Sequence, residues 1–280
     1  MNNNNKYSGK ISFCENDLTE ELFNVYKNSK CLAVDTEAMG LYHGRDRLCL
    51  IQICNESNLT ACIKIEMGNR KAPRIQNLLE NVKIMKIFHY ARFDVAALKC
   101  NLNIDTQNIF CTKIASKLAR TYTNKHGLKD LINELLGIEL DKSSQSSDWG
   151  SEENLSQNQI NYAANDVRYL IPIYFIQKKI LNKKMNQYSE VLKESEIQAE
   201  KGNEKLYKAR LKRKKMNSFE KKLFLWREKI AEEQNTPISY VFKDRKLKDL
   251  SHSLKSRNLK ILTKILGDNH LAKRLIKEIK

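Results

Sequence analysis

The amino-acid sequence contains no long hydrophobic run, because none of its apolar stretches reaches the roughly 18 residues that span a membrane. It begins with a methionine and four asparagines and has no apolar signal-peptide core, so residues 1–8 are expected to form a flexible tail. It has no Cys-x-x-Cys pair and no Cys/His cluster, which excludes the common zinc motifs. The seven cysteines lie mostly in apolar runs, so we expect reduced thiols in a cytoplasmic protein that does not contact membranes.

Positive charge is in excess and is unevenly distributed. The 280 residues carry 50 Lys and Arg against 33 Asp and Glu, a formal net charge of +17. Residues 1–180 have a net charge of only +3, and residues 181–280 have one of +14. A basic segment adds salt-dependent affinity for phosphates, although a solvated helix face has the same composition. The densest run, which we predict to contact nucleic acid, is Lys208, Arg210, Lys212, Arg213, Lys214 and Lys215.

Two acidic residues follow a short apolar run of strand-forming residues, Cys31-Leu32-Ala33-Val34. Asp35 and Glu37 are two residues apart, so on a strand they share one face. Two carboxylates on one face repel each other and are costly to desolvate unless a cation lies between them. Their hard oxygen ligands suit Mg²⁺ or Mn²⁺ better than zinc. On their own, the two acids are equally compatible with a solvated strand end.

A third acidic residue, Asp94, lies where a predicted core strand at 84–88 is followed by a predicted helix at 91–100. An acid at such a strand-to-helix corner can face the same cleft as Asp35. Taken alone, Asp94 would be an ordinary acid in the first turn of a helix, where the helix dipole favours it.

The fourth acidic residue lies in a helix that has a clear start signal. Ser156 and Gln159 have the spacing of a capping box, and apolar residues then recur at helical intervals. Tyr162 and Asp166 are four residues apart, so a phenol and a carboxylate project from one side of this helix. Without the other acids, a tyrosine packed beside a solvated aspartate would explain the pair.

These residues resemble the DEDD exonuclease superfamily, in particular its Tyr-containing branch. The three motifs correspond to Asp35-Thr36-Glu37, to Asp94 and to Tyr162-x-x-x-Asp166. Residues 35–54, 141–149 and 155–163 are also similar to ribonuclease D.

The resemblance implies hydrolysis of phosphodiester bonds, one nucleotide at a time from the 3′ end, with two divalent cations, Mg²⁺ or Mn²⁺, at each site. Tyr162, with a reference pKa near 10, is a poor free base at neutral pH and would orient the attacking water. Thr36 and His89 would contact nucleic acid, although His89 also suits a structural role. The cation ligands implied are Asp35, Glu37, Asp94 and Asp166.

The order of elements predicts an α/β fold. Strands expected at 31–36, 47–54 and 59–65 are followed by a helix at 73–81, a strand at 84–88 and a helix at 91–100. This order indicates a mixed sheet flanked by helices, as in the ribonuclease H-like fold of this superfamily. We expect three parts: a catalytic domain at 1–180, a basic helical connector at 181–217 and an all-α domain at 218–280.

The last of these parts has apolar residues at helical spacing. Ser218 is the expected N-cap of a helix that contains Trp226, and three short amphipathic helices should follow. Residues 225–231 and 265–267 resemble the HRDC domain that RecQ-type helicases and ribonuclease D share. The resemblance implies a small helical nucleic-acid-binding domain, in which Trp226 is expected to be structural.

Three functions remain compatible with the sequence. The first is an exoribonuclease that trims the 3′ ends of tRNA precursors or other structured RNAs, acting on single-stranded or 3′-tailed RNA without an obligate protein partner. The second is a DNA 3′–5′ exonuclease in repair, because Werner-type exonucleases share the fold and the acids. The third is a non-catalytic nucleic-acid-binding module, which the presence of all four acids and Tyr162 disfavours.

Overall fold

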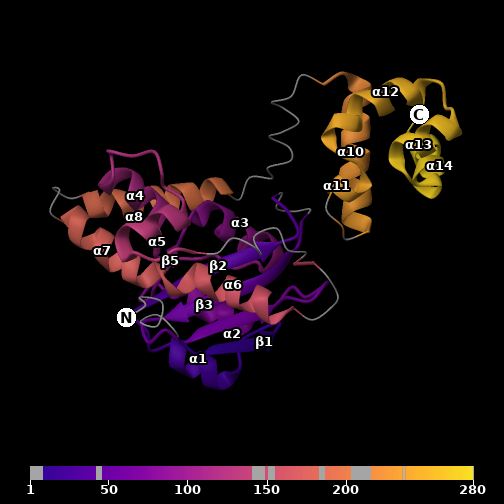
Figure 1. The fold of residues 1–280 in the computed structure, drawn as a ribbon. Helices are drawn as coiled ribbons and strands as arrows, with labels where there is room; N and C mark the ends of the chain where they lie inside the picture. The colour runs from indigo at the N-terminus through magenta and orange to yellow at the C-terminus, as the bar shows by residue number, and fades with distance from the viewer. Residues whose placement is uncertain are drawn as a thin grey trace. The chain divides into compact units, whose positions relative to one another are not determined.

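The computed structural model of the chain describes residues 9–41, 46–140, 149–150, 155–182, 187–202, 216–234, 236 and 238–279. The chain divides into two compact units, of which the first contains a sheet and ends at Glu204 and the second contains the C-terminal helices (Figure 1). The cationic run at 208–215 lies outside the described residues, so its contact with nucleic acid stays a prediction.

A mixed six-stranded sheet forms the centre of the first unit, in the order β1-β4-β3-β2-β5-β6. The central strand β2 is antiparallel to β3 and parallel to β5, and β6 extends the parallel part. The predicted α/β fold with a ribonuclease H-like mixed sheet is confirmed. The strands are β1 (Ile11–Glu15), β2 (Cys31–Ala38), β3 (Leu48–Asn55), β4 (Thr60–Lys64), β5 (Met85–Phe88) and β6 (Ile109–Cys111).

Helices cover both faces of the sheet. Alternate residues of the central strand β2 point to opposite faces and pack into different cores. Leu32 and Val34 pack into a core with α1, α2 and α3, whereas Cys31 and Ala33 pack into a second core with α4, α6, α7 and α8. The helices are α1 (Glu20–Tyr26), α2 (Pro73–Glu80), α3 (Ala91–Leu102), α4 (Thr112–Ala119), α5 (Leu128–Leu136), α6 (Gln157–Arg168), α7 (Leu170–Asn182) and α8 (Gln187–Gly202). By strand alternation, the odd-numbered residues of β2 face α6 and the even-numbered residues face α3.

The structure differs from the expected connector between residues 187 and 202. There α8 packs against α3, α4 and β6 as part of the first unit. Val191 and Ser195 are fully buried, and Ser195 Oγ accepts a 3.0 Å hydrogen bond from the backbone N–H of Cys111. The buried stripe of α8 is narrow and includes a serine. Because the segment is mostly polar, its sequence did not predict that α8 packs against the first unit.

The second unit is a bundle of short helices with its own apolar core. Its first helix is capped by Asn217, which forms a complete capping box with Glu220, so the expected N-cap at Ser218 was wrong by one residue. Trp226 is 5% exposed and donates a hydrogen bond to Glu278, which confirms its structural role. The elements are α10 (Ser218–Glu233), α11 (Ile238–Val241), η2 (Asp244–Lys246), α12 (Leu247–Lys255), α13 (Leu259–Leu266) and α14 (Asn269–Glu278).

All seven cysteines are free, and six of them are buried, as predicted. Burial raises the pKa of Cys31 and of Cys62 to about 12, so these groups stay protonated at neutral pH. Within the described ranges, no helix combines the length and the apolar character needed to cross a membrane.

Candidate active site

Three carboxylates from two elements converge at the end of β2. Asp35, Glu37 and Asp166 each offer an oxygen, and these oxygens lie within 4.8 Å of one another. Asp35 and Glu37 are odd-numbered residues of β2, so both face α6, which packs across β2, β3 and β4. The pairing of β2 with β3 shifts register between Glu37 and Ala38, so regular pairing ends just after the second acid.

The position of Asp166 depends on the local folding of α6. Ser156 and Gln159 form the predicted capping box, with Gln159 N–H donating to Ser156 Oγ and Ser156 N–H donating to Gln159 Oε1 at 2.9 Å. The helix ends at Arg168, since Pro172 has no N–H to continue the hydrogen bonding back to that turn. Ala163 and Val167 anchor α6 on the sheet, which leaves Asp166 directed at the β2 acids.

The fourth predicted acid reaches the cluster from the opposite face of the sheet. Asp94 lies in the first turn of α3 and is 3% exposed. Thr36, an even-numbered residue of β2, donates a 2.7 Å hydrogen bond from its hydroxyl to Asp94 Oδ1. Charge repulsion from Asp94 also raises the pKa of Asp35, so the two carboxylates are near enough to interact electrostatically. The structure therefore brings all four predicted acids together, three as a tight group and Asp94 beside them.

The cluster is electrostatically unfavourable without a cation. Burial and then repulsion by Asp94 and Asp166 raise the pKa of Asp35 well above its usual range. Burial and the same two neighbours raise the pKa of Glu37 to about 8. Burial raises the pKa of Asp94 and that of Asp166 to about 7. A group of oxygen-only ligands that resists losing its protons is the arrangement that a hard divalent cation stabilises, so these residues fit Mg²⁺ or Mn²⁺.

Tyr162 lies on the same side of α6 as Asp166 and hydrogen-bonds to its carboxylate. Burial and the charges of Asp166, Glu37 and Asp35 raise the pKa of Tyr162. The phenol therefore stays protonated at neutral pH and acts as a donor toward the cluster. The buried ring of Trp149 lies beside it, with ring centroids 6.2 Å apart, and limits its movement.

Two residues predicted to contact nucleic acid have structural partners. The hydroxyl of Thr36 is buried against Asp94, so its side chain supports an acid instead of facing solvent. His89 Nδ1 lies 2.9 Å from Thr112 Oγ1, which links the end of β5 to the start of α4. Burial and the charge of Lys113 lower the pKa of His89 to about 3, so it is neutral. Contact of either residue with nucleic acid stays a prediction.

Gln52 was not predicted to belong to the site. It lies directly opposite Asp35 on β3 and is fully buried. Neither atom of its amide has a hydrogen-bond partner among the described residues. Its position inside the apolar run of β3 concealed it, because one buried polar residue in such a run does not change the strand pattern.

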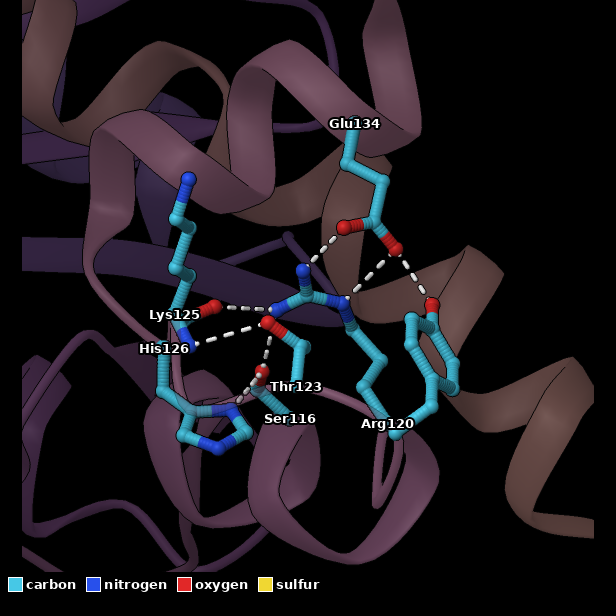
Figure 2. A network of polar contacts seen from close by, with 7 residues as sticks. Ser116, Arg120, Thr123, Lys125, His126 and Glu134 are labelled. Atoms are coloured by element: carbon cyan, nitrogen blue, oxygen red, sulfur yellow. Dashed lines mark hydrogen bonds and ion pairs between the residues drawn. The ribbon is translucent and has the colours of Figure 1, made fainter.

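A polar network joins the end of α4 to α5 (Figure 2). Arg120 is 2% exposed and donates to both carboxylate oxygens of Glu134, to Ser116 Oγ at 2.9 Å and to the backbone oxygen of Lys125 at 2.7 Å. His126 Nδ1 lies 2.9 Å from the same Ser116 oxygen. Hydrogen bonds from Arg120 and from Tyr122 lower the pKa of Glu134 to about 2. The network fixes the turn between the two helices.

A ribonuclease H-like sheet that holds four clustered acids and a protonated tyrosine defines a metal-dependent nuclease. A family model described as "3'-5' exonuclease" matches residues 11–185, and a model described as "HRDC domain" matches residues 217–279. The chain therefore belongs to the 3′–5′ exonuclease family and carries an HRDC domain after its catalytic part.

Known proteins agree with this assignment and with the predicted resemblance to ribonuclease D. Ribonuclease D of Bartonella henselae is 29% identical over 80% of this chain and 56% of its own length. The chain spans 56 to 66% of the length of the first three curated ribonuclease D relatives. The solved structure of Brucella melitensis NrnC bound to pGG is 42% identical, covers 69% of this chain and 93% of its own, and has a TM-score of 0.64. A Mg²⁺-bound structure of the same protein is 41% identical.

The fold is also similar to that of Escherichia coli RNase D. That structure covers 97% of this chain and 76% of its own, with a TM-score of 0.65 and 19% identity. At this level of identity, the similarity concerns the fold alone.

Proposed function

We propose that the protein is a 3′–5′ exoribonuclease that hydrolyses phosphodiester bonds with two divalent cations, held by Asp35, Glu37, Asp94 and Asp166. One observation carries the proposal: the oxygens of Asp35, Glu37 and Asp166 lie within 4.8 Å of one another, and Asp94 adjoins them. Four acids that lie together with Asp94 buried and the other three half-buried are costly unless a cation lies between them.

The proposed mechanism divides the chemistry between the ions and the chain. When bound, the two cations supply an acidified water and stabilise the charge that develops on the leaving 3′ oxygen. Asp35 and Glu37 hold the site from β2, and Asp166 completes it from α6. Tyr162 keeps its proton and donates to Asp166, so it orients a ligand of the site and the water beside it.

RNA is the proposed substrate class. The relatives named ribonuclease D support RNA as the substrate. We propose single-stranded or 3′-tailed RNA, such as the ends of tRNA precursors, and a cytoplasmic location, as the resemblance to ribonuclease D implies. DNA is the alternative, because Aquifex aeolicus DNA polymerase I is 33% identical over 64% of this chain. Comparing RNA with DNA of the same sequence separates the two.

A specific observation favours short RNA as a second candidate substrate. NrnC, which is 42% identical to this chain, has been solved bound to pGG. A site of similar shape in this chain would hydrolyse very short oligonucleotides. The HRDC domain instead favours longer RNA, because it adds a second binding surface.

The deciding experiment follows a 5′-labelled RNA with an unpaired 3′ tail on a sequencing gel, beside DNA of the same sequence and beside pGG. Each is incubated with Mg²⁺ or Mn²⁺, with chelator, and with the Asp35→Asn variant. We expect a metal-dependent ladder that shortens from the 3′ end on RNA, absent in the variant. Cleavage of DNA alone would favour the repair exonuclease. Binding without cleavage by folded protein would favour the binding module.

A further inference from the structure

A cleft of about 680 Å³ lies between the start of α3, one face of α4 and α8. Figure 1 shows these three helices grouped together. The volume is in the range of about 300–1,000 Å³ typical of ligand sites. Tyr90 and Arg92 line its mouth at the end of β5, four and two residues before Asp94. Tyr90 caps α3 and Asp94 lies in its first turn, so one helix start supplies both a residue of the cleft and one of the four acids.

The lining of the cleft carries an excess of positive charge. Lys113 and Lys117 are four residues apart on α4, so they present their ammonium groups on one face. Neither lysine forms an ion pair among the described residues. Arg92 and Lys193 add two further cations, and the carboxylates of Glu190 and Glu194 are the acids in the lining. Four cations against two acids beside a nuclease site suit a phosphate-bearing ligand.

Tyr90 is held in a strained conformation at the mouth of this cleft. Its backbone lies in the left-handed region with φ of 76°, which is rare for a bulky residue and typical of functional positions. The ring is 49% exposed, and Lys113 Nζ lies 4.4 Å from its centroid. An exposed aromatic ring next to cations is the arrangement on which single-stranded nucleic acids stack their bases.

Hydrogen bonds attach the walls of the cleft to the rest of the domain. Ser195 Oγ accepts from the backbone of Cys111 and donates to Val191 O at 2.6 Å, which fixes α8 on β6. Gln177 donates a 2.9 Å hydrogen bond to the backbone oxygen of Thr112, which fixes the start of α4. A cleft with fixed walls is pre-organised for a ligand.

We propose that this cleft binds the single-stranded RNA upstream of the scissile phosphate, with a base stacked on Tyr90 and phosphates held by Lys113 and Lys117. The terminal nucleotides occupy the acidic cluster, and the cleft takes the nucleotides that follow in the 5′ direction. The assignment of RNA as the occupant rests on the proposed function. It predicts a dependence on substrate length, because a substrate as short as pGG ends before the cleft.

The test uses the full chain with Lys113→Ala and Lys117→Ala combined. The matched control combines Lys30→Ala and Lys83→Ala, because both lysines are exposed and precede β2 and β5, at the ends of these strands opposite the acids. Affinity for a 12-nucleotide RNA is measured in the Asp35→Asn background, where cleavage is blocked, and kcat/KM for pGG is measured in the wild-type background. We expect about tenfold weaker binding of the 12-mer and a salt slope smaller by about 1.4, from two lost phosphate contacts.

Hydrolysis of pGG should be unchanged in the cleft variant, and the control pair should match the parent protein throughout. Tyr90→Ala should weaken binding of the 12-mer about tenfold, whereas Tyr90→Phe, which keeps the ring, should not. Unchanged affinity for the 12-mer in the lysine variant would overturn the proposal. Equal losses on pGG and on the 12-mer would also overturn it, because the lysines would then serve the terminal nucleotides. If the wild-type chain cleaves no RNA but the cleft variant still loses affinity, the proposed activity fails and the cleft remains an RNA site.

Discussion

Thr36 on β2 donates a 2.7 Å hydrogen bond to Asp94 on α3, two residues that are 58 positions apart in the sequence. The bond joins the first and second acidic motifs through the side chain that lies between Asp35 and Glu37. It also opposes the rise in the pKa of Asp94 that burial causes. Thr36 thus keeps the deeply buried acid in an orientation and a charge state suited to a cation.

Replacing Thr36 by valine should weaken cation binding. Valine keeps the shape but removes the donor, so Asp94 loses its support, and partners of this kind typically contribute about 10–100-fold to metal affinity. We expect the Mn²⁺ dissociation constant, measured by titration calorimetry, to increase at least about tenfold. Thr36→Ser keeps the hydroxyl and should bind nearly as the wild type does. Equal affinity in all three proteins would deny Thr36 this role.

Replacing Tyr162 by phenylalanine should slow turnover without weakening binding. The ring still packs beside Trp149, but the hydrogen bond to Asp166 is lost. We expect kcat to fall about 10–100-fold, as is typical when the hydrogen-bond partner of a metal ligand is lost, with little change in KM. Steady-state kinetics on the tailed RNA measure both constants. An unchanged kcat would remove Tyr162 from the catalytic residues.

Stabilisation of the protein by Mg²⁺ or Mn²⁺ should increase with pH. The pKa values of Glu37, Asp94 and Asp166 are raised in the folded chain to about 8, 7 and 7, above their values in the unfolded chain. Around neutral pH the folded chain therefore binds more protons than the unfolded chain does, and its stability falls as pH rises through 8. A cation replaces those protons.

The melting temperature measured with and without cation tests this pH dependence. The increase in melting temperature that the cation causes should be at least about 3 °C greater at about pH 8 than at about pH 6. In the Asp35→Asn variant, which carries one fewer charge in the cluster, the gain should be smaller at both pH values. A gain that falls with pH would contradict the assignment of the acids as ligands.

Replacing Glu134 by glutamine should destabilise the fold without altering the four acids of the candidate active site. Arg120 is almost fully buried and would lose a charged partner, which costs about 2 kcal/mol for hydrogen bonds of this kind (Figure 2). Because the pKa of Glu134 is lowered to about 2, its stabilisation is present above the unfolded value near 4.3 and is lost as pH falls toward 2. Urea unfolding should therefore separate the variant from the wild type at about pH 7 but not at about pH 2. Glu139→Gln, at an exposed position of the same segment, is the control.

Much of the site was predictable because its acids lie in local patterns. Asp35 and Glu37 follow an apolar strand, and Tyr162 and Asp166 follow a capping box, so spacing alone assigns each pair to one face. The link between Thr36 and Asp94 was not predictable, since it depends on how α3 crosses the end of β2. Gln52 was missed for the same reason: strand register, which brings it opposite Asp35, is not visible in one sequence.

The fold was predictable where segments are long and periodic. Strands β2 and β3 carry extended apolar runs, whereas β1 was missed because only one of its five residues is buried, and β6 because it has only three residues. Helix α8 was missed as part of the first unit because its buried side is narrow. The lysines of the cleft gave no local signal, because Lys113 and Lys117 join Tyr90 only after α8 has packed against both α3 and α4.

The alternation of side chains along β2 gives the site one more property. Asp35 and Glu37 belong to the layer under α6, and Thr36 with Asp94 belongs to the layer under α3. Neither layer alone contains a complete set of acids. A chain that has folded only one of its two cores during synthesis should therefore be inactive, and we expect the proposed nuclease activity to arise only when both halves of the domain have folded.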